Sequence, residues 1–325
     1  MFRSLFMLAL VLAIFGLAWA GVAVCLMAQM LLRPRRMSDA RALLKLGRLS
    51  PADLGLDFEP APFQVIDEST GKKLSLAAWW IEHRQGRGRC VVILHGYADA
   101  KVGGIAWAPL WRELGFHILA LDLRAHGESG GAYCSAGFWE RHDLIQVINR
   151  LKADRPQQTR QLVVFGVSLG AAVAAAAAAQ ADAPKIDAMI LESPYADFSH
   201  ASAEHGQRLG TPGAPFQRLA LRVAQWMARC DFAAVAPVRT IREVSCPLMV
   251  IACGDDPYVP RQDLALLAAA VAAREAKRGP SVYWELDEVH HVLGICRDPQ
   301  QYRRRIEEFL SAALGQGEPS PATSP

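Results

Sequence analysis

The stretch Gly166-Val167-Ser168-Leu169-Gly170 decides the fold, because an apolar run ends directly before it and a run of small residues, Ala171 to Ala179, follows it. This order predicts a strand, a sharp turn and a helix, with a serine at the apex of the turn. Such a turn lifts the serine hydroxyl above the edge of a sheet, and its glycines allow a close backbone approach. The pattern G-x-S-x-G also arises by chance, so its meaning depends on the rest of the chain.

Several other apolar runs of strand length also end in polar clusters. Helical stripes fill the gaps between them, and this alternation predicts a mostly parallel sheet. Because the carboxyl ends of parallel strands meet at one edge of an open α/β sheet, we expect the clusters to converge there. The clusters are His95-Gly96-Tyr97, Asp122 to Ser129, Glu192-Ser193-Pro194-Tyr195, Asp255-Asp256 and His290-His291.

A serine turn, an acidic residue and a histidine, in this chain order, resemble the α/β-hydrolase superfamily, in particular its esterase, lipase and peptidase-like members with an insertion after the sixth strand. The resemblance covers about residues 63 to 314. It implies an α/β-hydrolase fold at residues 61–314, with a mostly parallel, twisted sheet flanked by helices. Phe63 to Ile66 and Leu74 to Ile81 are expected to form an opening pair of antiparallel strands.

The resemblance also implies a catalytic site. Ser168 matches the family nucleophile, Asp256 matches the acid in a D-x-x-V-P segment, and His291 matches the base before a short apolar stretch. The backbone amides of Tyr97 and Leu169 would form the oxyanion hole. Acyl transfer by such a triad requires no metal and no cofactor, and no histidine pair has the spacing of a zinc site.

Two of these assignments have neighbours that compete with them. Asp255 is the alternative to Asp256, and His290 is the alternative to His291. Asp122 to His126 would look catalytic in isolation, but the resemblance identifies this segment as a loop fixed by ion pairs. Each residue of the site also has a structural interpretation, such as a turn serine or an aspartate that caps a helix.

Leu5 to Leu32 carries no charge and exceeds the roughly 20 residues that cross a bilayer. We therefore expect residues 1–36 to be an uncleaved transmembrane anchor, followed by a linker over residues 37–60. Ala18-Trp19-Ala20 resembles a signal-peptidase site, but cleavage there would leave the apolar stretch Gly21 to Leu32 at the new terminus. An anchor of this kind would set the location of the enzyme rather than its chemistry.

The charge pattern places the catalytic domain on the cytoplasmic side of a single-pass membrane protein. Arg33, Arg35 and Arg36 outnumber the charges at Arg3 and the amino terminus, and positive charge favours the cytoplasm. Seven cysteines without a recognisable spacing indicate no disulfide framework, as on a reducing side. A net charge of +3 and the absence of interleaved basic and aromatic residues argue against nucleic-acid binding.

Residues 197–240 form an insertion too long for a plain loop, and we expect a small helical lid over the acyl pocket. Its basic face either meets anionic lipid headgroups or is an ordinary solvated surface. The tail, residues 315–325, is rich in Pro, Ser and Gly and is expected to be disordered. The apolar helical stripe contains Phe216, Leu219, Ala220, Val223 and Met227, and the basic face contains Arg218, Arg222 and Arg229.

These patterns together predict a membrane-anchored serine hydrolase that cleaves a carboxylic ester, with an apolar acyl group in a small-molecule or lipid-like substrate. Peptide or amide hydrolysis, thioester hydrolysis and acyl transfer use the same triad, and no residue separates them. A hydrolase fold retained as a non-catalytic binding module is the alternative from another class.

Overall fold

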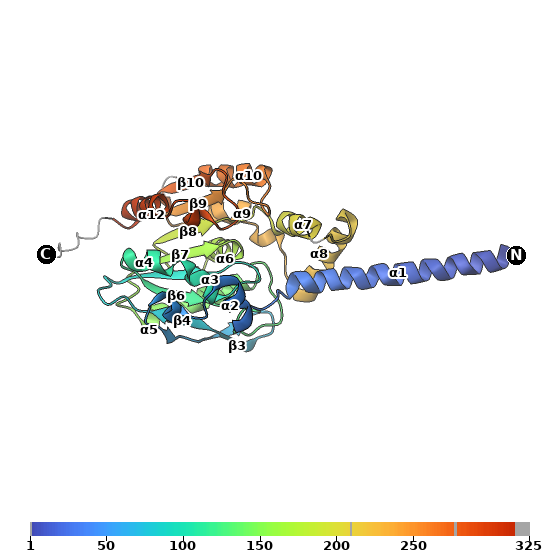
Figure 1. The fold of residues 1–325 in the computed structure, drawn as a ribbon, viewed down its shortest axis with the longest axis horizontal. Helices are drawn as coiled ribbons and strands as arrows, with labels where there is room; N and C mark the ends of the chain where they lie inside the picture. The colour runs from blue at the N-terminus through green and yellow to red at the C-terminus, as the bar shows by residue number, and fades with distance from the viewer. Residues whose placement is uncertain (1, 209, 276–277, 316–325) are drawn as a thin grey trace.

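The computed structural model describes residues 2–208, 210–275 and 278–315. Apart from Gly315, the predicted tail lies outside these residues. An eight-stranded sheet with the order β1-β4-β6-β5-β7-β8-β9-β10 forms the centre of the molecule (Figure 1). The strands from β6 to β10 in this order are parallel, whereas β4 and β1 are antiparallel additions. Their bounds are β1 (Glu59–Pro60), β4 (Ala78–Ile81), β5 (Arg89–Leu94), β6 (His117–Leu121), β7 (Gln161–Val167), β8 (Ala188–Glu192), β9 (Leu248–Cys253) and β10 (Ser281–Leu286).

The central strands are apolar throughout because both faces of the sheet are covered. Cys90 and Val92 of β5 face one core layer, whereas Val91 and Ile93 face the other. The first layer contains α5 (Glu140–Asp154), α6 (Leu169–Ala178), α9 (Pro237–Glu243) and α10 (Arg261–Ala272). The second contains α4 (Ala108–Glu113) and α12 (Pro299–Leu314), with the short helix η2 (Ile105–Trp107), whereas Val102 of α3 (Lys101–Gly104) belongs to a separate small cluster. The predicted doubly covered α/β sheet is thereby confirmed.

Residues 74–81 form two strands rather than the single strand expected from the sequence. β3 (Lys72–Leu76) pairs with β2 (Phe63–Asp67) in a separate antiparallel sheet, and β4 joins the main sheet. Ala77 lies at the break. Its amide donates to Ser129 Oγ at 2.8 Å, and its carbonyl accepts the Asp122 amide at 2.8 Å. The backbone of Ala77 therefore bonds to the loop after β6 and not to a neighbouring strand.

Most of the N-terminal helix stands apart from the sheet and the helices that cover it (Figure 1). Figure 1 shows α1 (Phe2–Leu32) extending away from the body, with its C-terminal end beside α8 (Ala214–Ala228). By length and composition α1 can cross a membrane. Ser38 caps the next helix, as its side chain accepts the Arg41 amide. The other elements are α2 (Asp39–Leu46), η1 (Pro51–Leu54), α7 (Phe198–Arg208), η3 (Ala233–Val235) and α11 (Gly294–Arg297).

Candidate active site

Ser168 lies at the sharp turn between β7 and α6, where its backbone adopts φ 52° and ψ −112°. This positive φ is costly for a non-glycine residue and holds the side chain above the sheet. A Cβ on Gly166 would lie 2.4 Å from the Gly170 carbonyl oxygen, and one on Gly170 would lie 2.3 Å from the Leu94 carbonyl oxygen. Both glycines are therefore required by packing. The Leu169 amide is in the first turn of α6, where amides lack an intrahelical acceptor.

The structure brings Ser168, His291 and Asp256 together from the ends of β7, β10 and β9. His291 Nε2 lies 3.0 Å from Ser168 Oγ, and His291 Nδ1 lies 2.5 Å from Asp256 Oδ2. The Asp256 side chain is almost fully buried, whereas the His291 side chain keeps 19% of its surface exposed. With the Nδ1 proton donated to the carboxylate, Nε2 is free to accept the serine hydroxyl. The arrangement can therefore activate Ser168 as a nucleophile.

The neighbouring residues Asp255 and His290 lie apart from this contact. His290 Nδ1 is 3.0 Å from the Asp255 carbonyl oxygen, a main-chain acceptor. The Asp255 carboxylate faces the exposed guanidinium of Arg261 at 3.8 Å. In the structure it is therefore Asp256 and His291, and not Asp255 and His290, that are in contact with each other and with Ser168.

The loop after β5 passes beside Ser168 and carries the Tyr97 amide. A Cβ on Gly96 would lie 3.5 Å from Ser168 Cβ, which shows how closely the loop approaches. The buried His95 ring fixes this loop: Nδ1 donates to the Gly96 carbonyl at 2.7 Å, and Nε2 accepts the Leu123 amide at 3.1 Å. The loop is thus held by the neighbouring loop after β6, independently of any substrate.

Glu192, the last residue of β8, and Ser193, which follows it, support the loop that carries His291. The carboxylate of Glu192 accepts the Tyr302 hydroxyl at 2.5 Å and the Gly294 amide at 3.2 Å. Ser193 Oγ accepts the Val292 amide at 3.2 Å. Burial raises the pKa of Glu192 to about 7. Their position at the end of a strand was visible in the sequence, but no motif indicated that they position a histidine loop.

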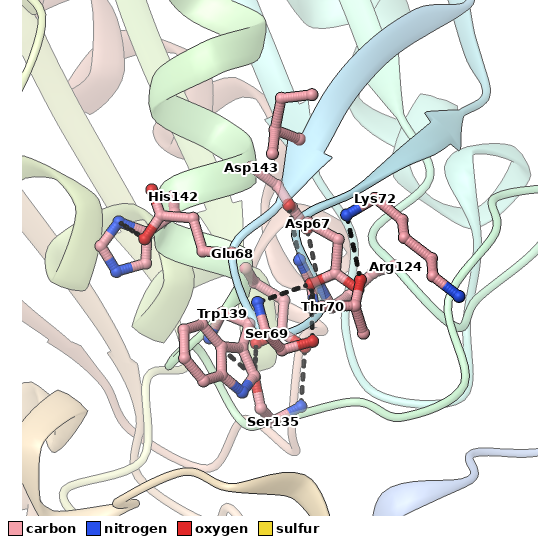
Figure 2. A network of polar contacts seen from close by, with 12 residues as sticks. Asp67, Glu68, Ser69, Thr70, Lys72, Arg124, Ser135, Trp139, His142 and Asp143 are labelled. Atoms are coloured by element: carbon pink, nitrogen blue, oxygen red, sulfur yellow. Dashed lines mark hydrogen bonds and ion pairs between the residues drawn. The ribbon is translucent and has the colours of Figure 1, made fainter.

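Asp122 to His126 form a fixed loop, as the sequence predicted. Figure 2 shows Arg124 between Asp143 and Asp67, with bonds of 2.6 and 2.7 Å to the first carboxylate and 3.0 Å to the second. Asp122 accepts both the amide and the ammonium group of Lys101, at 2.6 and 2.8 Å. These buried pairs join the β2–β3 hairpin, α5 and α3 to the loop behind the site, and they leave its charges satisfied.

A cavity of about 700 Å³ opens onto Ser168 and His291. Its walls come from the sheet edge, from α7 and α8, and from the C-terminal end of α1 with the residues that follow it. Most of its surface is apolar. Among the described lining residues the side chains with a formal charge are Arg33, Arg35, Arg41, Lys45 and Asp99.

The inward face of α8 matches the predicted stripe in part, since Val223 and Met227 pack against the core. Ala220 and Leu221 line the cavity, as does Gln217, whereas Phe216 and Leu219 are exposed. Small residues allow α8 to approach α1 closely, and this packing selects the alanine face over the face with larger side chains. The arginines Arg218, Arg222 and Arg229 are exposed.

α7 contacts the loop that carries Asp256. The Tyr258 ring packs edge-on against His291 with centroids 5.1 Å apart, and the His205 ring of α7 lies 5.6 Å from Tyr258. Arg208 Nε donates to the Pro257 carbonyl at 3.0 Å. The insertion therefore touches the site directly.

Comparisons with known proteins give one consistent fold. The profile of the family described as serine aminopeptidase, S33, matches residues 86–231. The chain is 26% identical to the uncharacterized protein YqkD of Bacillus subtilis over 221 residues, 68% of this chain and 70% of YqkD. It is 26% identical to the lysophosphatidylserine lipase ABHD12 of Macaca fascicularis over 274 residues, 75% of this chain but 63% of the lipase.

Among solved structures, the esterase Pf2001 of Pyrococcus furiosus superimposes with a TM-score of 0.68 at 23% identity, covering 88% of this chain and 99% of the esterase. This likeness concerns the fold. The strand order, the serine turn between β7 and α6 and the similarity to these proteins lead to one conclusion. The chain has the α/β-hydrolase fold.

Proposed function

We propose that this protein is a membrane-anchored serine hydrolase that cleaves a carboxylic ester with an apolar acyl group. The observation that carries the proposal is the continuous contact from Asp256 through His291 to Ser168, with distances of 2.5 and 3.0 Å. Such a chain of hydrogen bonds is what nucleophilic acyl transfer requires.

In this mechanism Ser168 Oγ attacks the ester carbonyl carbon while His291 Nε2 takes its proton. The tetrahedral intermediate places its negative oxygen toward the amides of Tyr97 and Leu169. Loss of one such donor costs roughly 3 to 4 kcal/mol of barrier in comparable enzymes. The intermediate collapses to an acyl-serine as His291 protonates the leaving alcohol. Water, deprotonated by His291, then releases the carboxylic acid and restores Ser168.

The charges of the cavity favour an ester over a peptide amino terminus. An aminopeptidase must bind a substrate ammonium group, whereas four of the five formally charged lining side chains here are cationic: Arg33, Arg35, Arg41 and Lys45. The described residues form no ion pair with any of these four cations. An apolar pocket with a cationic rim instead suits an amphiphilic ester with an anionic head, and the similarity to a lysophosphatidylserine lipase agrees with that choice.

The same proposal assigns the parts of the chain. Residues 1–36 anchor the protein in the membrane in a single pass, residues 37–60 link the anchor to the catalytic domain, and residues 197–240 are the lid. Arg33, Arg35 and Arg36 favour a cytoplasmic catalytic domain. The uniformly exposed apolar surface of the first part of α1 supports the anchor, since such a surface is stable only in an apolar solvent.

A fluorophosphonate probe tests the proposal, because it reacts only with an activated serine. Full-length protein in detergent is expected to be labelled, and Ser168→Ala is expected to abolish both labelling and hydrolysis of p-nitrophenyl butyrate. Ser199→Ala, in α7 and outside the cavity, is the matched control and should label normally. Labelling that persists in Ser168→Ala would assign a different nucleophile.

The alternatives are separate outcomes of the same assay. Faster turnover of a p-nitroanilide or a thioester than of the matched ester would redirect the proposal to amides or thioesters. A folded wild-type chain that neither labels nor turns over any of these substrates would favour a non-catalytic binding module.

A further inference from the structure

The two ends of α1 have different environments. Phe2–Trp19 is exposed at all eighteen residues, whereas Val24, Ala28 and Leu32 are buried. The buried residues recur every fourth position and therefore form one face of the helix. That face packs against α8. The second part of α1 is thus part of the folded catalytic domain.

The length of each part agrees with this division. At 1.5 Å per residue, Phe2–Trp19 extends about 27 Å, close to the roughly 30 Å hydrocarbon core of a bilayer. Met27 lies eight residues further along the helix, about 12 Å beyond this stretch. The end of α1 therefore stands just outside the hydrocarbon, next to the headgroup layer.

This end of α1 forms one wall of the cavity that contains Ser168. Met27, Met30 and Leu31 line the cavity from α1, and Leu221 lines it from α8. Unbranched, flexible methionine side chains adapt to apolar ligands of varying length. The wall has the chemistry of a site for an acyl chain.

Hydrogen bonds fix the position of this wall. The Tyr97 hydroxyl donates to the carbonyls of Met30 and Leu31, at 2.7 and 3.1 Å. The Leu32 carbonyl accepts the Cys134 amide at 2.7 Å. These bonds also satisfy carbonyls that the end of a helix leaves without intrahelical donors.

Arg36 adds a second attachment four residues later. Its guanidinium donates to the carbonyls of Gly127 and Ser129, at 2.8 and 2.6 Å. The wall is thus held both at the oxyanion loop and at the loop after β6.

We infer that Met27, Met30 and Leu31 are the acyl-chain subsite of this hydrolase, so that the membrane anchor itself is part of the substrate-binding site. This inference rests on the proposed ester hydrolase function. A long acyl chain reaches Ser168 from the bilayer surface along the face of α1 that carries Met27, Met30 and Leu31. Chain-length preference is then set by residues of the anchor and not by the catalytic domain alone.

Met30→Trp in the full-length protein tests this inference, because the larger indole ring would occupy part of the cavity that Met30 lines. The measured quantity is the ratio of kcat/KM for p-nitrophenyl laurate to that for p-nitrophenyl butyrate, in one detergent. We expect this ratio to fall about tenfold or more. Leu26→Trp is the matched control: Leu26 is as exposed as Met30, at 56% against 58%, but it does not line the cavity. It should leave the ratio at the wild-type value.

A second variant covers the case in which Met30→Trp does not fold. Met30→Ala enlarges the cavity beside α1, and we expect it to shift the chain-length preference from the laurate ester toward the palmitate ester. An unchanged preference in a folded Met30 variant, or an equal shift in Leu26→Trp, overturns the inference. Failure of the proposed function looks different, since wild type would then hydrolyse none of these esters and resist the fluorophosphonate probe.

Discussion

The phenol hydroxyl of Tyr97 donates a hydrogen bond of 2.7 Å to the Met30 carbonyl oxygen, which joins the loop beside Ser168 to the last turn of α1. The same residue contributes the amide proposed for the oxyanion hole. Two roles thus meet in one residue: its side chain holds the end of α1, and its main-chain amide is the proposed oxyanion donor.

Tyr97→Phe separates these functions, because it keeps the amide and the ring but removes the hydroxyl. We expect a fall of a few-fold in kcat and a loss of about 1 kcal/mol in the free energy of unfolding, the usual value of one hydrogen bond. Tyr133→Phe is the control, since the structure shows no hydrogen bond from that hydroxyl to the described residues. Equal effects of the two variants would contradict a specific role for the Tyr97 bond.

The acid and base assignments predict a ranking within each neighbouring pair. Asp256→Asn should depress acylation by about a thousandfold or more, because the buried carboxylate orients His291 and stabilises its charged form. Asp255→Asn should stay within about tenfold of wild type, because its carboxylate faces solvent and Arg261. Pre-steady-state release of p-nitrophenol measures both rates.

The histidines provide the parallel test. His291→Ala should match Asp256→Asn or exceed it, whereas His290→Ala should lose only the bond to the Asp255 carbonyl. The opposite order in either pair would move the triad by one residue.

The raised pKa of Glu192 predicts that the free energy of unfolding depends on pH. Burial raises its pKa from 4.5 to about 7, so the folded chain retains a proton that the unfolded chain releases. This contribution is complete below pH 4.5 and is lost as the pH rises to about 7. Glu192→Gln cannot ionise and should escape the loss, which amounts to at most about 3 kcal/mol. Urea unfolding of both proteins at pH 5 and pH 8 measures the difference; curves that shift in parallel would argue against it.

The proposed orientation can be tested with a native thiol. Cys296 is exposed on the catalytic domain, so a membrane-impermeant maleimide should reach it only from the side on which that domain lies. In spheroplasts of a bacterial expression host we expect labelling only after permeabilisation, and the double variant Cys25→Ser/Cys296→Ser, which removes both exposed thiols of the described residues, should remove the signal. Labelling of intact spheroplasts would place the domain on the outer side.

The sheet and the convergence of Ser168, Asp256 and His291 could be predicted because each residue follows an apolar strand, and parallel strands bring their carboxyl ends to one edge. The break between β3 and β4 at Ala77 could not be predicted. It depends on hydrogen bonds of Ala77 to Asp122 and Ser129, which are distant in the sequence.

The contribution of α1 to the cavity also could not be predicted from the sequence. A helix that is apolar on every side has no periodicity to mark the face that meets protein. The prediction that Leu219 lies on the inward face of α8 was wrong for a related reason. α8 packs against α1, and close packing of two helices favours the small Ala220 over Leu219 at the contact.

The packing of α1 on α8 limits how modular this enzyme can be. A tether that merely holds a catalyst at a surface can be exchanged for any other tether of equal length. Here only the first eighteen described residues of α1 are of that kind, whereas Ala28 and Leu32 pack into the core of the same chain. Changes on the two sides of that contact must therefore be compatible. If the proposed acyl-chain subsite is correct, an N-terminal helix taken from another protein would change the substrate preference.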